Sequence, residues 1–359
     1  MVAPNAVRIY GRAGNAVGSC GILLSAMTTC ENAKLEEIRV AGKTFHVPSA
    51  EICGRTVVVT GNWIRTAEVK DEAVVEGVVV EDPGSFITKL KESKLQADVF
   101  TFAQRLPDTA PKYDYHWEWD NCAAISTACF NEWWENLPQV SRKNVRRSAR
   151  RGVVVKIVPF DDDLVKGIHR IYNSIRVRDG RLFWHYGQDI DRVRQDLATY
   201  LDRSDFIGAY LGEELIGFLK MVYVDQVATI FHIISMDDHY DKRPQNALIA
   251  KAAEVCEQKG ISHLIYGKFI YGNKRRSSLV EFKRRNGFQQ INFPRYHISL
   301  TPLGDLFVRL RLYRGFAGLV PEPILHVILN CRAWYYKAIS TNRTLQDRNS
   351  AGVAQRQSS

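Results

Sequence analysis

The sequence has little of what marks metal-binding, secreted or membrane-spanning proteins. Its seven cysteines are widely spaced, none forms a Cys-x-x-Cys pair, and no histidine stands at a zinc-finger offset from them. We therefore predict no metal, and the odd number of cysteines favours a reduced, cytosolic compartment. No apolar run reaches the roughly 18 residues that a membrane-spanning helix needs.

The start of the chain also lacks the continuous apolar segment of an export signal. Its apolar stretch is short, and glycine, serine and cysteine interrupt it. We interpret residues 1–35 as a disordered or loosely held arm, rich in Gly, Ala, Ser and Asn. No internal repeat is recognisable.

What the chain does have is a globular composition with an excess of positive charge. Of its 359 residues, 45% are hydrophobic, 25% charged and 11% aromatic, and the formal net charge is +10. This excess favours anionic partners, namely phosphates, nucleic acid or an acidic membrane face, without choosing among them.

Shifts in composition predict the organisation of the chain. Short β-branched runs separated by Gly, Asp and Glu indicate a small strand-rich unit over residues 36–110. Strand and helix patterns alternate over 115–302, which predicts an α/β (α+β) domain. Two apolar, basic helical stretches follow over 303–339, and the polar residues 340–359 are typical of a disordered tail.

The alternating region predicts a defined order of elements. Tight turns separate three of its strands, so these three form an antiparallel meander. The predicted elements are a strand at 122–127, helices at 129–137 and 139–152, a continuous buried strand at 153–158, helices at 161–180 and 189–203, the meander at 206–211, 214–224 and 227–235, a helix at 246–260, a strand at 263–267, a helix at 276–287 and closing strands over 288–300.

A meander, a helix, a parallel strand, a second helix and a final hairpin, in this order, resemble the GNAT superfamily of acyl-CoA N-acyltransferases. The resemblance implies that the fourth strand, 228–235, splays from the fifth, 263–266, and that the donor's pantetheine arm enters the gap. It also implies that the helix after the fourth strand points its free amides at the donor pyrophosphate. On this sequence, that turn is 241–246.

The sequence departs from the GNAT pattern at this turn. Most coenzyme A-binding members carry a Q/R-x-x-G-x-G/A run, whereas this chain has Arg243-Pro244-Gln245-Asn246-Ala247-Leu248, without glycine. The positive charges and the helix N-terminus remain, so acyl-CoA stays the implied donor. The donor contacts we expect come from Lys242, Arg243, Gln245, Asn246 and Ala247.

A second departure points to one branch of the superfamily. Many GNAT enzymes place a general-acid tyrosine four residues before the closing Gly-Phe, but this chain has Lys283 there. The Phe282-Lys283 pair and the basic run 138–155 resemble the Fem-type peptidyltransferases and related transferases near exopolysaccharide genes. Fem-type enzymes transfer an aminoacyl group from tRNA to a cell-wall precursor, and many relatives use other acyl donors.

The basic segment 139–156 holds seven basic side chains and no acidic one. It is either a solvated helix face or a surface that follows phosphates, for tRNA or a nucleotide-linked sugar, with Arg147 as our candidate contact. Lys283 likewise is either a surface lysine or a contact to a substrate phosphate.

Four further residues are candidates around the expected cleft. His232, in the middle of an apolar strand, is either a satisfied buried histidine or the base that accepts the proton of an ammonium acceptor. Asp238, just after that strand, is an alternative base acting through a water. Tyr266 and Tyr296 are packing residues or, respectively, a proton donor and a substrate contact.

The implied function is N-acyl transfer from an acyl-CoA-type donor to an amine of a sugar, peptide or cell-envelope precursor. The amine would attack the carbonyl directly, without a covalent enzyme intermediate. Two other functions stay open: a tRNA-dependent aminoacyl transferase, and a non-catalytic GNAT-fold binding module, which the missing glycines suit. The helical stretches 303–339 either dock on the main domain or lie on an anionic membrane surface, which would suit a lipid-linked acceptor at the inner membrane face.

Overall fold

The computed structural model describes residues 34–40, 43–72, 80–178, 181–271 and 277–314. Almost all of the predicted N-terminal arm therefore lies outside the described residues. So do the tail, 340–359, and the greater part of the C-terminal stretches, 315–339. Among the described helices, none is long and apolar enough to cross a membrane.

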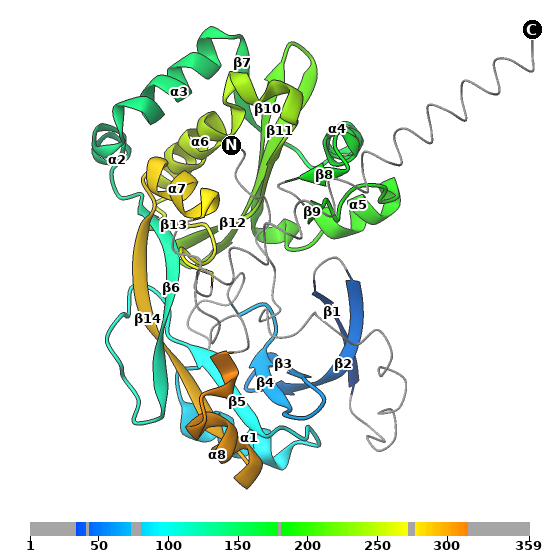
Figure 1. The fold of residues 1–359 in the computed structure, drawn as a ribbon, viewed down its shortest axis with the longest axis vertical. Helices are drawn as coiled ribbons and strands as arrows, with labels where there is room; N and C mark the ends of the chain where they lie inside the picture. Colours follow the sequence, from blue (N-terminus) through cyan, green and yellow to red (C-terminus); the bar gives the residue numbers. More distant parts are fainter. Residues whose placement is uncertain (1–33, 41–42, 73–79, 179–180, 272–276, 315–359) are drawn as a thin grey trace, which may run out of the picture.

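The described strands form a large sheet of twelve strands and a small sheet of two. Figure 1 shows the large sheet running through the whole molecule, with β1–β5 in the lower part and β7 and β10–β12 in the upper part. The order in the large sheet is β1-β2-β3-β4-β5-β14-β6-β13-β12-β11-β10-β7, and the small sheet is β8-β9. The strands are β1 Lys34–Val40, β2 Lys43–Ile52, β3 Arg55–Thr60, β4 Thr66–Val69, β5 Val99–Ala103, β6 Trp117–Ser126, β7 Val153–Val158, β8 Val177–Arg178, β9 Arg181–Leu182, β10 Ser204–Leu211, β11 Glu214–Val224, β12 Val227–Ser235, β13 His263–Ile265 and β14 Gln289–Ser299.

Helices pack on both faces of the upper part of the sheet, and two more contact strands of its lower part. The helices are α1 Pro83–Glu92, α2 Phe130–Asn136, α3 Gln139–Arg150, α4 Asp162–Asn173, α5 Ile190–Leu197, α6 Pro244–Gln258, α7 Ser278–Arg285 and α8 Pro302–Arg309, with short 3-10 turns η1 Leu201–Arg203, η2 Asp237–Lys242 and η3 Leu312–Arg314.

The meander β10–β12 is the centre of the upper core, as predicted. Successive side chains of a strand point to opposite faces, so Leu219 and Met221 of β11 pack with α6, whereas Phe218 packs with α4 and α5. Because both faces are covered, β11 is apolar along nearly its whole length.

Strand β14 joins the two parts of the molecule. Its first residues, Gln289 to Tyr296, pair with β6, and its last, Arg295 to Ser299, pair with β5. The prediction of several closing strands over 288–300 was wrong, because this segment is one continuous strand. The predicted boundaries of the units at 36–110 and 115–302 remain predictions, since one sheet runs through both.

Other predicted elements also differ from the structure. The helix predicted at 189–203 ends at Leu197, and the strand predicted at 122–127 begins at Trp117. The strand 153–158 is not buried throughout: β7 is the edge strand, with β10 as its partner, and its Val154 is 58% exposed. The helix that we predicted to reach residue 180 begins as expected, with Asp161 accepting a hydrogen bond from the amide of Leu164, but it ends at Asn173. The two-residue strand β8 follows it, and its Arg178 is buried, with hydrogen bonds described below.

Candidate functional site

Strands β12 and β13 run parallel and then part. They pair only at Val227 with His263, Ala228 with Leu264 and Thr229 with Ile265. β12 continues for six more residues, paired with β11 on its other side. The chain after β13 instead stays with β6, the other neighbour of β13, where the amide of Tyr266 donates to the carbonyl of Ala123. A gap therefore opens between the two strands after their third pair, as the resemblance implied.

A pocket lies at the upper end of this gap, at the N-terminus of α6. Its volume is about 130 Å³. It is formed where the end of β12 meets α3, η2, α6 and α7. The lining residues are Ser141, Asn144, Ser235, Tyr240, Arg243, Pro244, Gln245, Asn246, Ser278, Glu281, Phe282, Arg285 and Asn286.

The N-terminus of α6 is open towards this pocket. The residue before the helix, Arg243, has left-handed backbone angles (φ 58°, ψ 40°), and no side chain caps the first turn. The N-terminus of a helix carries partial positive charge and attracts anions. The first residue of α6, Pro244, has no N–H, and the amides of Asn246 and Ala247 donate to the carbonyl of Arg243. The attraction for a phosphate therefore comes from the dipole of α6 as a whole.

Arg243 adds a full positive charge at the same place. Its guanidinium carbon lies 4.4 Å from the ring centroid of Tyr240, and its Nε is buried without a hydrogen-bond partner among the described residues. Leaving a buried donor unpaired is unfavourable. An oxyanion in the pocket would satisfy it.

Polar contacts hold the surrounding helices against this end of α6. The hydroxyl of Ser141 on α3 donates to the carbonyl of Arg285 on α7 (2.5 Å), and the side-chain amide of Asn246 on α6 donates to that of Asn286 (2.7 Å). The lining helices α3, α6 and α7 are thus tied to one another, which fixes the shape of the pocket.

Of the predicted donor contacts, three line the pocket: Arg243, Gln245 and Asn246. Lys242 instead forms an ion pair with Asp241 (3.4 Å), and Ala247 is buried but does not line the pocket. The predicted turn and the observed pocket therefore agree on the middle of the segment.

Lys283 is buried rather than on the surface, with 1% of its area exposed. Its Nζ donates to the carbonyl of Lys268 (2.6 Å) and lies 4.5 Å from the ring centroid of Tyr266. Burial lowers the pKa of Lys283 to about 7. The interpretation of Lys283 as a surface lysine was wrong, whereas its contact with a substrate phosphate stays a prediction.

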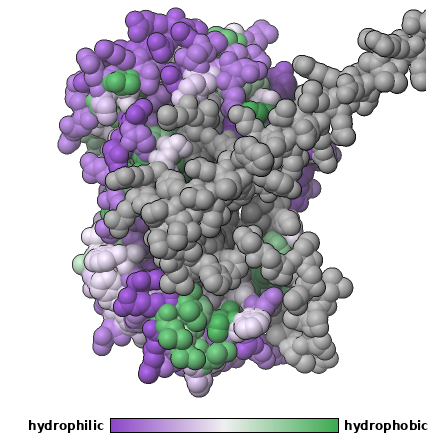
Figure 2. Space-filling model, viewed as in Figure 1, coloured by the Kyte–Doolittle hydropathy of each residue, from purple (hydrophilic) through white to green (hydrophobic). Residues whose placement is uncertain are grey.

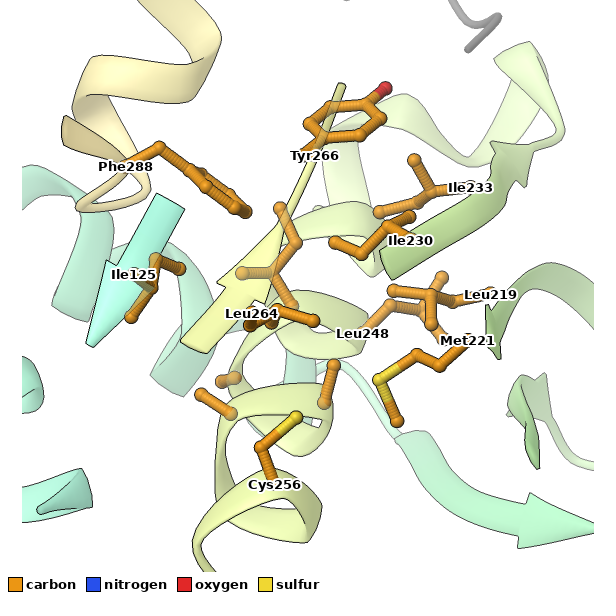
Figure 3. Packing of buried hydrophobic residues seen from close by; sticks show 14 of the residues in the cluster. Ile125, Leu219, Met221, Ile230, Ile233, Leu248, Cys256, Leu264, Tyr266 and Phe288 are labelled. Atoms are coloured by element: carbon orange, nitrogen blue, oxygen red, sulfur yellow. The ribbon is translucent and has the colours of Figure 1, made fainter. Parts of the chain in front are cut away.

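Tyr266 stands at the point where the strands part. Figure 3 shows its ring beside Ile230 and Ile233 of β12, with the hydroxyl directed away from the apolar cluster. Burial, with a smaller contribution from Tyr271, raises the pKa of Tyr266 above its usual value, so it stays protonated at neutral pH. Lys283 and Tyr266 are thus two predicted site residues that the fold brings together.

His232 lies on the face of β12 towards α4 and α5. It is buried, its ring is 5.8 Å from that of His185, and Lys220 of β11 is its neighbour across the sheet. Burial, with smaller contributions from His185 and Lys220, holds the pKa of His232 well below its ordinary value. His232 is therefore neutral at pH 7, and the same burial weakens it as a base.

The other three candidates lie on three different elements. Asp238 is exposed in η2. Arg147 is exposed on α3, the helix that lines the pocket through Ser141 and Asn144. Tyr296 is fully buried in the lower core, where its ring stacks on Phe102 and its hydroxyl accepts from the amide of Lys112 (2.9 Å). The structure does not bring Tyr296 to the pocket.

The sequence analysis missed two buried cations near the gap. Lys220 donates to the carbonyl of Leu197 (2.8 Å) at the end of α5, and Arg178 donates to the carbonyl of Ser235 and to Asp237 (2.5 Å each). Arg178 thereby fixes the end of β12, next to the pocket. A lysine in the centre of the apolar run ELIGFLKMVYV was the available signal for Lys220, whereas nothing local marks Arg178.

Among the described residues, no group of three His, Cys, Asp or Glu side chains is arranged to hold a metal ion. The residues at the pocket fit a phosphate-bearing organic donor better, because they offer amides, amide side chains and arginines.

No protein-family profile matches the chain, and no curated protein matches it by sequence. Solved structures do match. FemX aligns over 78% of this chain and 90% of its own, with a TM-score of 0.51 and 11% identity.

Two further matches have lower TM-scores. The C-terminal domain of a putative lysylphosphatidylglycerol synthetase from Agrobacterium fabrum aligns over 74% of this chain and 88% of its own (TM-score 0.48, 12% identity). L-PGS from Bacillus licheniformis aligns over 75% and 88% (TM-score 0.47, 12% identity). Together with the strand order, the match to FemX shows that this chain has the predicted α/β, GNAT-like acyltransferase fold.

Proposed function

We propose that this chain is an acyltransferase that moves an acyl group from a coenzyme A-type donor to an amine of a sugar, peptide or cell-envelope precursor. The proposal rests on one observation. Strand β12 separates from β13 beside the uncapped N-terminus of α6, where the Nε–H of Arg243 is buried without a hydrogen-bond partner among the described residues.

The donor would lie along β12 beyond Thr229. The pairing of β12 with β13 ends at that residue, and a pantetheine arm carries amides that suit the edge of a strand. Its pyrophosphate would then reach the N-terminus of α6 and the guanidinium of Arg243. The acyl carbonyl would stand in the gap, between Tyr266 and β12.

The reaction needs one new bond and two proton transfers. The acceptor nitrogen forms a C–N bond with the acyl carbon, and the C–S bond to the donor breaks. His232, neutral at pH 7, would accept the proton of the amine, directly or through a water, with a water on Asp238 as the alternative route. Tyr266, which stays protonated, would supply a proton to the leaving thiolate, and the ammonium of Lys283 would hold its ring.

A second donor class is favoured by α3. This helix lines the pocket and also exposes a row of basic side chains, so a longer polyanion than coenzyme A would find more contacts there. A tRNA-linked aminoacyl donor is therefore the alternative. The exposed basic residues of α3 are Lys143, Arg146, Arg147 and Arg150.

Ligand-induced thermal stabilisation separates these functions. We expect acetyl-CoA and desulfo-CoA to stabilise the protein, by about 2.7 kcal/mol at one hundred times the dissociation constant. Arg243→Gln should lose this stabilisation. Lys242→Gln is the matched control, because Lys242 is adjacent but does not line the pocket, and it should keep the effect.

The alternatives give different results. Stabilisation by aminoacyl-tRNA alone, lost in the double variant Arg146→Gln/Arg147→Gln, would favour the tRNA-dependent transferase. No response to any of these donors would contradict both transferases and favour a non-catalytic binding module.

A further inference from the structure

Helix α8 has apolar side chains on two opposite faces. Val308 and the backbone of Gly304 pack inward against the ends of β5 and β14. Leu303, Leu306 and Leu310, at helical spacing on the other side, are about half exposed, with Leu306 at 53% and Leu310 at 57%. Figure 2 shows a hydrophobic patch at the lower end of the molecule, where Figure 1 places α8.

The orientation of α8 is fixed, so these leucines cannot turn into the core. A Cβ at position 304 would lie 1.9 Å from the carbonyl oxygen of Asp98, which means that only glycine allows this approach. Thr301 caps the helix at the amide of Gly304 and also donates to the carboxylate of Asp98 (3.0 Å). The outward leucine row is therefore a stable feature of the surface.

A second segment presents an aromatic side chain at the same end. Trp63, in the turn before β4, is 92% exposed. Its neighbour Ile64 packs with Val308 and Tyr313, and the next residue, Arg65, is bonded to Asp98 through its backbone and side chain. The turn that holds Trp63 and the start of α8 are thus both bonded to Asp98, although more than 200 residues separate them.

Positive charges surround this apolar surface. From residue 302 to 314 the chain carries three arginines and one aspartate. Arg309 is 76% exposed and pairs with Asp305, while Arg311 and Arg314 share the single carboxylate of Glu118. These three arginines and two carboxylates leave the surface with a net charge of +1, which favours an anionic partner over a second copy of the same charge.

We propose that this surface, made by Trp63, Leu303, Leu306, Leu310 and the adjacent arginines, docks on an anionic lipid bilayer. Leucines of a fixed helix enter the boundary between headgroups and acyl chains, tryptophan favours this interfacial layer, and arginines pair with lipid phosphates. The proposal concerns where the protein sits, and it does not depend on the reaction proposed above.

Vesicle co-sedimentation of the full chain tests the proposal. We expect binding to phosphatidylcholine vesicles that contain phosphatidylglycerol, and weak binding to phosphatidylcholine alone. The double variant Leu306→Glu/Leu310→Glu should lower the partition coefficient by at least about tenfold, because two carboxylates replace apolar contacts at an anionic surface.

Val154→Glu is the matched control, since Val154 is equally exposed on β7, at the opposite end of the molecule in Figure 1. It should sediment like the original chain. Both variants should keep the native circular dichroism spectrum. Equal sedimentation of the double variant and the original chain would overturn the proposal. So would a dimer that the double variant dissociates while neither protein binds vesicles, because a second copy would then occupy the surface.

Discussion

At the scale of single residues, the structure is unusual in burying two lysines. Lys220 and Lys283 are both essentially inaccessible to solvent, and burial lowers the pKa of each to about 7. Each ammonium is compensated by carbonyl oxygens and aromatic rings rather than by a carboxylate. Such groups change charge near neutral pH, and both stability and activity should reflect this.

The first prediction concerns stability against pH. Each of these lysines has a pKa of about 7 in the folded state and near 10.4 in the unfolded chain. Above pH 7 the unfolded chain therefore binds more protons than the folded protein does. The free energy of unfolding should therefore rise between pH 7 and 8.5, by up to about 1.4 kcal/mol per pH unit for each lysine. Urea unfolding of the original chain and of Lys283→Met measures this slope.

The Lys283→Met slope should be smaller, because one titrating group is gone. Lys166→Met, at an exposed position, is the control and should keep the original slope. Above pH 9 the rise should level off, because burial raises the pKa of Cys122 and Cys256 to about 12, so that ionisation of these thiols in the unfolded chain offsets the contribution of the two lysines. An identical slope in Lys283→Met and the original chain would contradict the assignment.

His232 gives the second prediction. If it accepts the amine proton, His232→Gln should lower kcat by about 10²- to 10⁴-fold and leave the donor KM nearly unchanged. His263→Gln is the matched control, because His263 lies on β13 in the paired part of the two strands. Steady-state kinetics of both variants provide the measurement. Comparable losses in both would assign His232 a packing role.

At the scale of elements, the prediction concerns the packing of α8 against the segment at Asp98. Gly304→Ala should destabilise the protein by about 1 to 3 kcal/mol, because its Cβ would meet the carbonyl of Asp98 at 1.9 Å. Gly84→Ala is the control: its Cβ would meet only the side chain of Asp82, at 3.3 Å, in the first turn of α1. It should change stability by less than about 1 kcal/mol. Equal effects in urea unfolding would show that α8 can shift at little cost.

The elements also show how much of the fold can be predicted from local sequence. The meander and α6 were predictable because their apolar periodicity and their glycine and turn residues agree. The edge position of β7 was not, since VVVKIV has the pattern of a strand covered on both faces and its partner is decided by the rest of the sheet. Likewise, nothing local indicates that β14 lies between β5 and β6, because strand pairing is non-local.

The candidate site, too, could be predicted from the sequence only in part. The turn that holds Arg243, Gln245 and Asn246 follows from its place after the fourth strand, so its position at the pocket was predictable. The burial of Lys283 was not, because a lysine beside Arg284 and Arg285 has every local sign of an exposed face. Its burial results from the packing of α7 against the segment after β13, which no short window of sequence contains.

At the scale of the whole molecule, the lower strands and the upper sheet depend on each other. β14 belongs to both, and Tyr200 after α5 donates to Asp71 after β4. A fragment of residues 115–302 would lose β5, the partner of β14, and would uncover Tyr296 and Ile298. We predict that this fragment is insoluble or lacks a cooperative unfolding transition, as expression and circular dichroism can show; a stable, soluble fragment would contradict the account.

The central claim is that the parting of β12 and β13, with Arg243 at the end of α6, forms a site for a phosphate-bearing acyl donor. A crystal structure of the protein soaked with coenzyme A tests it most directly. The account predicts the pantetheine arm along residues 230–235 and the pyrophosphate against Arg243 and the N-terminus of α6. Coenzyme A bound elsewhere, or a gap that stays empty at saturating ligand, would contradict it.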